Sequence, residues 1–215
     1  MSETIEFYTN PMSRGQTVRW MLEEVGAPYE TVILDYATTL KAEPYLSINP
    51  MGKVPAIRHR GKVVTEVAAI CCYLADAFPE AGLAPEPRDR ADYYRWIFFT
   101  SGPIEAAFSN KAAGFEPTPE RQRMFGYGNY DLAIGTLEKA LTGREYLAAD
   151  YFTAADLFVG ANVNFMLAFN LLEPRPVFVD YARRMTDRPA YERAKDIDAK
   201  LAAEIQAQAQ PQPVE

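Results

Sequence analysis

The change in hydrophobic pattern near residue 80 limits most strongly what this chain can fold into. Before that point, short apolar runs typical of β-strands lie at residues 5–8, 29–34, 54–57 and 62–64. Two segments between them have the spacing and end signals of helices, residues 17–25 and 66–78. Beyond residue 80 the apolar residues recur at helical spacing, and strand signals are almost absent. The sequence therefore predicts an α/β first part, in the order β-α-β-β-β-α, and an all-helical second part.

The boundary between the two parts is predicted from composition. Residues 79–89 are rich in proline and acidic residues, which suits a linker. Helical spacing then begins around Tyr93 and Trp96, continues over residues 122–141, and includes a capping-box variant at residues 153–156. We expect a first domain over residues 1–79, a linker over 80–89, a helical domain over 90–208 and a disordered tail over 209–215.

Composition excludes several classes of partner. The chain has 215 residues, 48% of them hydrophobic, and a formal net charge of −7. Because an acidic protein repels phosphate backbones and anionic lipids, we expect no nucleic-acid partner and no binding to a membrane surface. No apolar run approaches the ~18 residues that a membrane-spanning helix needs. We expect a cytoplasmic protein.

The cysteine and histidine content argues against metal and thiol-redox chemistry. Cys71 and Cys72 are adjacent on a predicted helix, where their side chains point to different faces and are poorly placed for a disulfide. We interpret them as small hydrophobic residues, with a redox pair as the alternative. The single histidine, His59, lies between two arginines in a predicted hairpin turn and cannot assemble a His/Cys metal cluster. We therefore expect no metal, and neither metal-hydrolase nor serine-hydrolase chemistry.

Several segments occur together in the order and spacing of a known enzyme family. They are residues 8–14 leading into 19–30, residues 49–57, residues 65–79, and residues 94–99 with 151–157. In these segments the chain resembles the soluble bacterial glutathione transferases. The resemblance implies a thioredoxin-like α/β N-terminal domain, with a cis proline at Val54-Pro55, and an all-α C-terminal domain. It also implies glutathione as the co-substrate.

The resemblance assigns glutathione contacts to residues around that proline. In the family, the residue before the proline pairs its own amide and carbonyl with the cysteinyl part of glutathione, as an added strand would. Here that residue is Val54, followed by Pro55. Glu66 matches the acidic or amide residue that engages the γ-glutamyl group, although an acid there also stabilises the helix dipole. Lys53 and Lys41 are candidates for the glycyl carboxylate, or are solvated surface charges.

Val67 departs from the family pattern. The family usually has Ser or Thr at this position, and its hydroxyl donates to the γ-glutamyl carboxylate. Valine keeps only the backbone amide. A hydrogen bond to a charged group contributes roughly 1.5–3 kcal/mol, so its loss weakens binding by about 10- to 150-fold. Thr65 can compensate only if the helix begins one residue away from the expected place.

The thiol activator implied by the resemblance lies in the loop after the first strand. Ser13 is the first candidate, because a hydroxyl at a helix N-terminus can donate to a thiolate that nearby amides already favour. The alternative is that residues 13–16 form a capping box in which Ser13 serves only the backbone. Asn10, Thr9 and Tyr8 remain candidates, since families differ in which loop residue activates the thiol.

The helical part is expected to hold the second substrate. Trp96, Phe99, Tyr127 and Tyr130 are candidates for a hydrophobic pocket, with burial in the helical core as the alternative. The resemblance then implies a homodimeric transferase in which the glutathione thiolate attacks a small apolar electrophile. A glutathione-dependent isomerase, dehalogenase or reductase uses the same thiolate. A non-catalytic binding or regulatory protein of the same fold is the alternative from another class.

Overall fold

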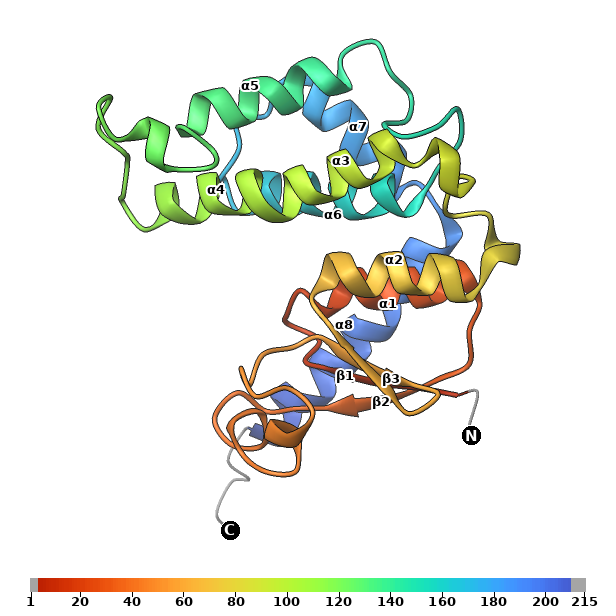
Figure 1. Ribbon diagram of the computed structural model, residues 1–215. Coiled ribbons are helices and arrows are strands. Elements are labelled where there is room, and N and C mark those ends of the chain that lie inside the picture. The colour runs from red at the N-terminus through yellow and green to blue at the C-terminus, as the bar shows by residue number, and fades with distance from the viewer. Residues whose placement is uncertain (1–3, 210–215) are drawn as a thin grey trace. The chain divides into compact units, whose positions relative to one another are not determined.

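A computed structural model describes residues 4–209 of the chain (Figure 1). Its contacts divide the chain into two compact units. The first contains the residues up to Ala81 together with those from Arg188 onward, and the second contains Gly82–Asp187. The predicted tail over residues 209–215 lies outside the described residues except for Ala209, which ends the last helix.

The first unit contains a four-stranded mixed sheet. Its strands are β1 (Ile5–Thr9), β2 (Tyr29–Ile33), β3 (Ala56–His59) and β4 (Lys62–Thr65), in the order β2-β1-β3-β4. β1 and β2 are parallel, so the chain must cross over between them, and it does so through α1 (Gly15–Val25). β3 and β4 form an antiparallel hairpin, and β3 also pairs antiparallel with β1. The predicted α/β first part is confirmed.

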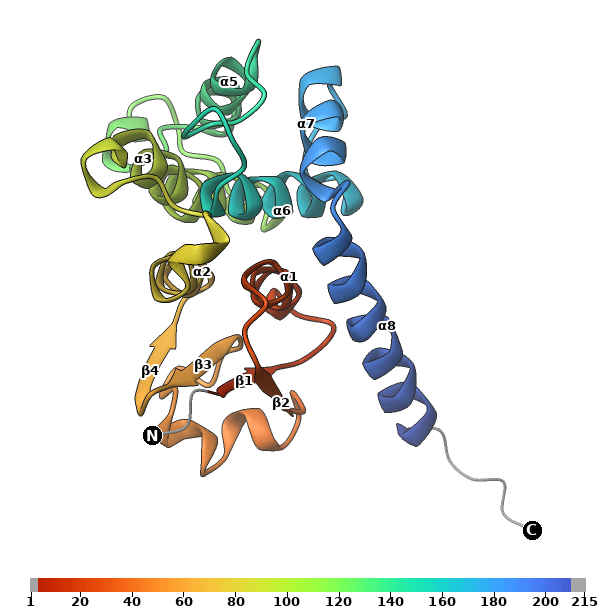
Figure 2. The same cartoon turned by 90° about the vertical axis from the view of Figure 1, so that its right-hand side faces the viewer.

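The two faces of this sheet are covered differently. α1 and α2 (Val67–Ala77) lie on the same face in both views (Figures 1 and 2). Residues of β1 alternate between the faces, so Phe7 and Tyr8 point in opposite directions. The core cluster that contains Tyr8 is made with the segment between β2 and β3, including 3-10 turns at Thr39–Lys41 and Tyr45–Ser47. β1 is therefore buried on both faces, with α1 beginning shortly beyond its C-terminal end.

The last helix, α8 (Pro189–Ala209), belongs by its contacts to the first unit and packs along α1. The boundaries expected from sequence placed residues up to 208 in the helical domain, and the contact division differs from them here. The physical reason is a set of long-range side-chain contacts to α1, including a buried ion pair between Arg19 and Asp198.

The second unit is helical throughout its regular structure. Its α-helices are α3 (Ala91–Phe99), α4 (Glu105–Ala112), α5 (Tyr130–Leu141), α6 (Ala154–Ala168) and α7 (Pro176–Thr186). A π-helical turn at Thr100–Ile104, which contains Pro103, joins α3 to α4. α6 packs against α3 and α7 and is mostly buried. The predicted all-helical second part is confirmed.

One helix of this unit is shorter than expected. Apolar spacing indicated helix over residues 122–141, whereas α5 begins only at Tyr130. Gly128 has a φ of 68° in the preceding turn, a left-handed conformation that interrupts a helix. Asn129 then caps α5, its Oδ1 accepting from the Leu132 amide at 2.8 Å. Local turn and capping chemistry therefore overrides the apolar period.

The predicted capping box at the start of α6 is confirmed. Asp156 Oδ2 accepts from the backbone amide of Thr153 at 3.1 Å and from its hydroxyl at 2.9 Å. Asp156 Oδ1 accepts from the Leu147 amide and the Tyr181 hydroxyl, at 2.8 and 3.0 Å. Burial raises the pKa of the Asp156 carboxyl, which these four hydrogen bonds partly oppose. Within residues 4–209, no helix is long and apolar enough to cross a membrane.

Candidate functional site

The loop between β1 and α1 places Ser13 at the start of a helix. The Ser13 hydroxyl donates to the Asn10 carbonyl at 2.6 Å and accepts from the Gly15 amide at 2.9 Å. Its single proton is therefore engaged within the loop. The Gln16 side chain donates to the Pro11 carbonyl at 2.7 Å. The alternative capping box over residues 13–16 is not formed, because the N-cap of α1 is Arg14 without a side-chain cap, but the Ser13 hydroxyl does bond to the backbone of its own loop and of Gly15.

Asn10 has a scaffolding position. Its side chain is 3% exposed. The amide nitrogen donates to the Leu34 carbonyl at 2.9 Å, and the amide oxygen accepts from the Met12 backbone at 3.0 Å. Asn10 therefore fastens the loop to the residue after β2. Its polar groups hold the backbone on which Ser13 is placed.

Tyr8 and Thr9 are buried, so their hydroxyls are not exposed hydrogen-bond donors. The Tyr8 hydroxyl contacts Glu6 and Arg58, and its ring packs 5.7 Å from that of Tyr45 on the sheet face opposite α1. Burial, followed by the hydrogen bond to Glu6, raises the pKa of Tyr8. Thr9 is fully buried, and its hydroxyl donates to the Asn10 carbonyl at 3.3 Å. Among the four candidates, Ser13 alone is partly exposed at the N-terminal end of α1.

The segment before β3 offers an unpaired backbone edge. The Val54–Pro55 peptide bond is cis, and β3 begins immediately afterwards at Ala56. Within the described part of the chain, neither the amide nor the carbonyl of Val54 has a hydrogen-bond partner. An extended peptide can pair with such an edge as an added strand.

Side chains of neighbouring residues hold the loop before Val54 through hydrogen bonds to its backbone carbonyls. The Lys53 carbonyl accepts from the Asn49 side chain at 2.8 Å and from the Tyr45 hydroxyl at 2.5 Å. The Lys41 ammonium donates to the Gly52 carbonyl at 2.7 Å and also contacts the Met51 carbonyl, at 3.1 Å. Lys41 therefore braces the loop, whereas the exposed Lys53 side chain has no ion-pair partner among residues 4–209.

Asn49 and Tyr45 are supporting residues that sequence reasoning did not single out. Asn49 is 5% exposed and also accepts from the Met51 amide at 3.1 Å through its side-chain oxygen. Its place before Pro50 and Gly52 is a turn signal, so the sequence contained a hint of this role. Tyr45 had no such local signal, since its partner is fixed by the folded loop.

Glu66 has an unusual backbone conformation at the start of α2. Its φ is 65° and its ψ is 119°, which is rare for a residue with a side chain. A conformation of this kind costs of order 1–3 kcal/mol and is concentrated at functional sites. The Glu66 side chain is exposed, and its carbonyl accepts from the Ile70 amide at 2.9 Å. The carboxylate therefore stands free at a helix N-terminus.

α2 begins at Val67, one residue after the expected start at Glu66, which is the N-cap of the helix. The shift is away from Thr65, which is the last residue of β4 and pairs with Ala56. Thr65 is thus part of the sheet and does not supply the hydroxyl that Val67 lacks. The amides of the first helical turn have no partner within the helix and make its N-terminus suitable for an anion.

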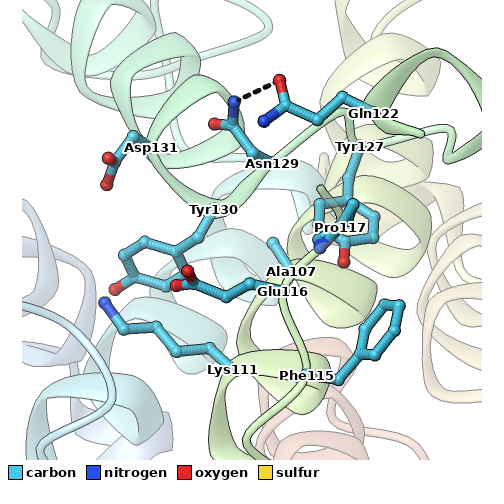
Figure 3. Close-up of a pocket in the computed structure, with 10 residues that line it drawn as sticks. All are labelled: Ala107, Lys111, Phe115, Glu116, Pro117, Gln122, Tyr127, Asn129, Tyr130 and Asp131. Atoms are coloured by element: carbon cyan, nitrogen blue, oxygen red, sulfur yellow. Dashed lines mark hydrogen bonds between the residues drawn. The ribbon is translucent and has the colours of Figure 1, made fainter. Parts of the chain in front are cut away.

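The four predicted pocket residues of the helical unit border three separate cavities. Trp96, 3% exposed and in edge contact with Phe99, borders a cavity of about 500 Å³. Phe99 and Tyr127 border another of about 470 Å³, together with Phe125 and Leu132. Tyr127 and Tyr130 border a third, of about 170 Å³ (Figure 3).

The cavity in Figure 3 is polar. The Lys111 ammonium lies 3.5 Å from the centre of the Tyr130 ring, and the carboxylates of Glu116 and Asp131 also line the cavity. The hydroxyls of the two tyrosines are engaged, Tyr127 with the Asn110 side chain at 2.9 Å and Tyr130 with a backbone carbonyl at 2.7 Å. The cavity between Phe99 and Tyr127 has a more apolar lining, which includes Phe125, Leu132 and Ala133 and suits an apolar molecule.

The two cysteines and the histidine have structural surroundings: Cys71 and His59 are buried, and neither cysteine is in a disulfide. Cys71 is buried, which raises the pKa of its thiol, and neither Cys71 nor Cys72 is in a disulfide. His59 is not in the hairpin turn: it is the last residue of β3, 1% exposed, stacked on Phe78 and 2.9 Å from the Tyr73 hydroxyl. Residues 4–209 contain no group of three or more His, Cys, Asp or Glu that could hold a metal.

A family model matches the part of the chain that carries the site. The model describes the N-terminal domain of glutathione S-transferases and matches residues 12–77. The matched range runs from the loop that contains Ser13 through the cis proline to the end of α2.

Curated relatives extend the similarity into the helical unit. Protein LigF of Sphingobium sp. (strain NBRC 103272 / SYK-6) is 30% identical, with 76% of this chain and 77% of that protein covered. Glutathione S-transferase GST-4.5 of Xanthomonas campestris pv. campestris is also 30% identical, over 72% of this chain and 79% of that protein. Both alignments cover more than two thirds of each relative.

Solved structures share the whole architecture. A glutathione transferase from Methylococcus capsulatus is 26% identical, with a TM-score of 0.75 and coverage of 91% of this chain and 99% of that one. Glutathione transferase URE2P6 from Phanerochaete chrysosporium, solved in complex with oxidized glutathione, is 25% identical, with a TM-score of 0.74 and coverage of 93% and 98%.

Proposed function

Since this chain belongs to the glutathione S-transferase family, we propose that it binds glutathione and activates its thiolate for attack on a small hydrophobic electrophile. The observation that carries the proposal is the combination of the unpaired Val54 backbone with the free N-terminus of α2 and the strained Glu66 beside it. Together they offer a peptide edge, amides for a carboxylate and a carboxylate for an ammonium. The complex of URE2P6 with oxidized glutathione supports the same ligand.

Each part of glutathione has a proposed partner in the first unit. The cysteinyl part pairs with Val54 after the manner of an added strand, with Pro55 holding the turn. The γ-glutamyl carboxylate binds the first-turn amides of α2 at Val67, and its ammonium binds Glu66. Lys53 is the proposed partner of the glycyl carboxylate. Lys41 contributes indirectly, because its ammonium is already held by loop carbonyls.

Ser13 is the proposed activator of the thiol. To donate to the sulfur, its hydroxyl must turn its proton away from the Asn10 carbonyl. The Gly15 amide, which donates to the Ser13 oxygen, polarises the hydroxyl and makes it a better donor. The N-terminus of α1 favours negative charge at the same place. Catalysis then consists of stabilising the thiolate and aligning it with the second substrate. Asn10 and Tyr8 are proposed to position this loop.

The second substrate is proposed to bind the helical unit in the cavity bordered by Phe99 and Tyr127. Trp96 supports it from beneath Phe99, with ring centroids 5.6 Å apart. Tyr130 lines the separate polar cavity and acts on this site only through α5. The proposal includes cytoplasmic detoxification by a homodimer that needs no metal and has no nucleic-acid or membrane partner.

Titration of glutathione by calorimetry tests the proposal. Binding at millimolar ligand is expected, and Glu66→Gln should weaken it by about 10-fold or more, because the ammonium loses its charged partner. Glu86→Gln, an exposed acid at the start of another helical turn, is the matched control and should bind as the native protein does. Absence of binding to the native protein at millimolar glutathione contradicts the proposal.

A non-catalytic binding or regulatory protein is the second candidate. It is favoured by Val67, which removes one ligand contact, and by the engagement of the Ser13 proton within its own loop. This candidate predicts glutathione binding without acidification of the thiol. The absorbance of the bound thiolate as a function of pH distinguishes the two. A glutathione-dependent isomerase or dehalogenase also needs the thiolate, and a reductase is disfavoured because the activator loop contains no cysteine.

A further inference from the structure

We propose that the buried pair Arg19 and Asp198 is a positioning pair, through which the terminal helix α8 sets the place of α1 and hence of Ser13 at the thiol site. The inference rests on the proposed function for its chemistry. Its geometric part, that α8 controls the loop before α1, can be tested independently. It concerns residues 179 positions apart in the chain.

Arg19 joins four elements of the first unit. Its Nε donates to Asp198 Oδ1 on α8 at 2.8 Å, and its Nη1 donates to the Thr31 hydroxyl on β2 at 3.0 Å. The guanidinium carbon lies 5.1 Å from the centre of the Phe7 ring on β1. Arg19 is fully buried, and Asp198 is 4% exposed. A displacement of α1 must therefore break or strain contacts to both neighbouring strands and to α8.

Other polar, directional contacts join α1 to Arg188, which directly precedes α8, and to α8 itself. Glu24 accepts two hydrogen bonds from Arg188, at 2.6 and 2.8 Å, in a bidentate pair. Glu23 accepts from Arg193 at 2.9 Å. Fixed forks of this kind specify relative position along the helices, whereas apolar contacts tolerate sliding. The Trp20 and Tyr191 rings, 5.0 Å apart, fill the space among these pairs.

The chemistry of the Arg19 pair suits positioning better than stabilisation. A buried ion pair loses much of its attraction to desolvation, and apolar replacements are often neutral or stabilising. Here the pair is joined by one hydrogen bond. Among the described residues, Arg19 Nη2 and Asp198 Oδ2 are buried without a hydrogen-bond partner. Two buried charged groups that each leave a polar atom without a hydrogen bond contribute little to stability. Their one hydrogen bond nevertheless fixes the position of α1 along α8.

The register of α1 reaches the proposed thiol site through Gly15. Gly15 opens α1 and lies four residues before Arg19, about 6 Å along the helix axis. Its amide donates to the Ser13 hydroxyl. A side chain at Gly15 would place Cβ 1.9 Å from the Thr9 hydroxyl, so the first turn is already in close contact with the end of β1. With so little free space, α1 cannot shift without moving the Gly15 amide and Ser13.

The test compares Asp198→Asn with Arg193→Gln. Both remove an ion pair between α1 and α8, but the Arg193 pair is partly exposed and lies about 6 Å farther from Gly15 along α1. The first readout is the pKa of the bound glutathione thiol, from thiolate absorbance. We expect Asp198→Asn to raise that pKa by about half a unit or more, which lowers the ratio of thiolate to thiol about threefold, and Arg193→Gln to leave it unchanged. The thiol pKa of both variants is measured at a temperature at which circular dichroism shows that they are folded.

A second readout needs no glutathione. Amide hydrogen exchange at residues 10–16 should accelerate in Asp198→Asn and stay native in Arg193→Gln. If Asp198→Asn does not fold, Asp198→Glu keeps the charge and displaces the carboxylate by one methylene, and the same two shifts are expected. A purely structural pair would lower the melting temperature while leaving both readouts native, and that result overturns the inference. Failure of the native protein to bind glutathione overturns the proposed function alone, since exchange at residues 10–16 still decides the positioning role.

Discussion

At the scale of single residues, Glu66 shows most directly how the fold serves a site. Its positive φ costs of order 1–3 kcal/mol, and glycine adopts such a conformation without that cost. Glu66→Gly should therefore increase the free energy of unfolding by about 1 kcal/mol while weakening glutathione binding. Urea unfolding and calorimetry measure the two effects. Glu66→Gln is the control and should leave stability native; a Glu66→Gly protein that is less stable would show that the conformation is not strained.

Ser13 has a structural and a proposed chemical role, and two substitutions separate them. Ser13→Ala removes both hydrogen bonds of the hydroxyl and should cost about 1 kcal/mol of stability, as well as raising the pKa of the bound thiol. Ser13→Thr keeps a hydroxyl and should retain a low thiol pKa. A native thiol pKa in Ser13→Ala would remove Ser13 from the activating role.

Folding shifts the pKa values of two carboxyl groups in opposite directions. The Tyr8 hydroxyl and then Arg58 lower the pKa of Glu6, whereas burial raises the pKa of Asp156. The stabilising contribution of ionised Glu6 is therefore present above its unfolded-state pKa and is lost as pH falls through the folded value. For Asp156 the sign is reversed, because the fold favours its protonated form and stability declines as pH rises from the unfolded to the folded pKa. Carbon-13 NMR titration of the two carboxyls checks both directions, and Arg58→Gln should move Glu6 alone.

At the scale of elements, much of the architecture follows from local signals, and the exceptions have identifiable causes. The strands, α1 and α2 follow from period and end signals, and the cap of α6 was recognised from Thr153 and Asp156. Apolar spacing predicts α5 too long, because the left-handed Gly128 and the Asn129 cap start the helix only at Tyr130. The association of α8 with α1 could not be predicted, since an arginine and an aspartate 179 residues apart leave no local pattern.

The site was predictable to a similar extent. The loop with Val54 and the start of α2 at Val67 carry turn and capping signals that locate them in sequence. Which polar atoms are already engaged depends on the folded backbone. Lys41 was expected to meet a ligand carboxylate, but its ammonium meets loop carbonyls. The sequence pattern identifies polar groups that could bind a ligand. Only their positions in the structure show which of them are not already hydrogen-bonded within the protein.

The packing of α6 against α7 gives a matched pair of glycine substitutions. A Cβ at Gly160 of α6 would lie 2.6 Å from the Met185 Cβ on α7, whereas one at Gly135 of α5 would meet nothing within 4 Å. Gly160→Ala should therefore destabilise the protein by about 1–3 kcal/mol through overpacking. Gly135→Ala should stabilise it by about 0.5–1 kcal/mol, because alanine favours a helix. Chemical denaturation measures both, and equal effects at the two sites would contradict this account of the α6–α7 contact.

At the scale of the whole molecule, the first unit is built from two segments that the helical unit separates in sequence. It needs residues up to Ala81 and the helix that follows Arg188, while Gly82–Asp187 form a unit of their own. A chain that ends at residue 187 should lose order in its first unit, because the face of α1 that packs on α8 becomes exposed and Arg19 loses its carboxylate partner. Hydrogen exchange followed by mass spectrometry should show faster exchange over residues 4–81 and native protection over 82–187. Equal loss of protection in both units would contradict this expectation.

The discontinuous first unit has a consequence for synthesis on the ribosome. Domains generally fold from the N-terminus as the chain emerges, at about 5–20 residues per second. Here Asp198, which pairs with Arg19, is translated only after residues 82–187. The nascent first unit must wait for the whole helical unit to be translated before α1 is locked in place. The helical unit, continuous in sequence, is free to fold first, and the loop that contains Ser13 is held in its final place only after α8 has been translated.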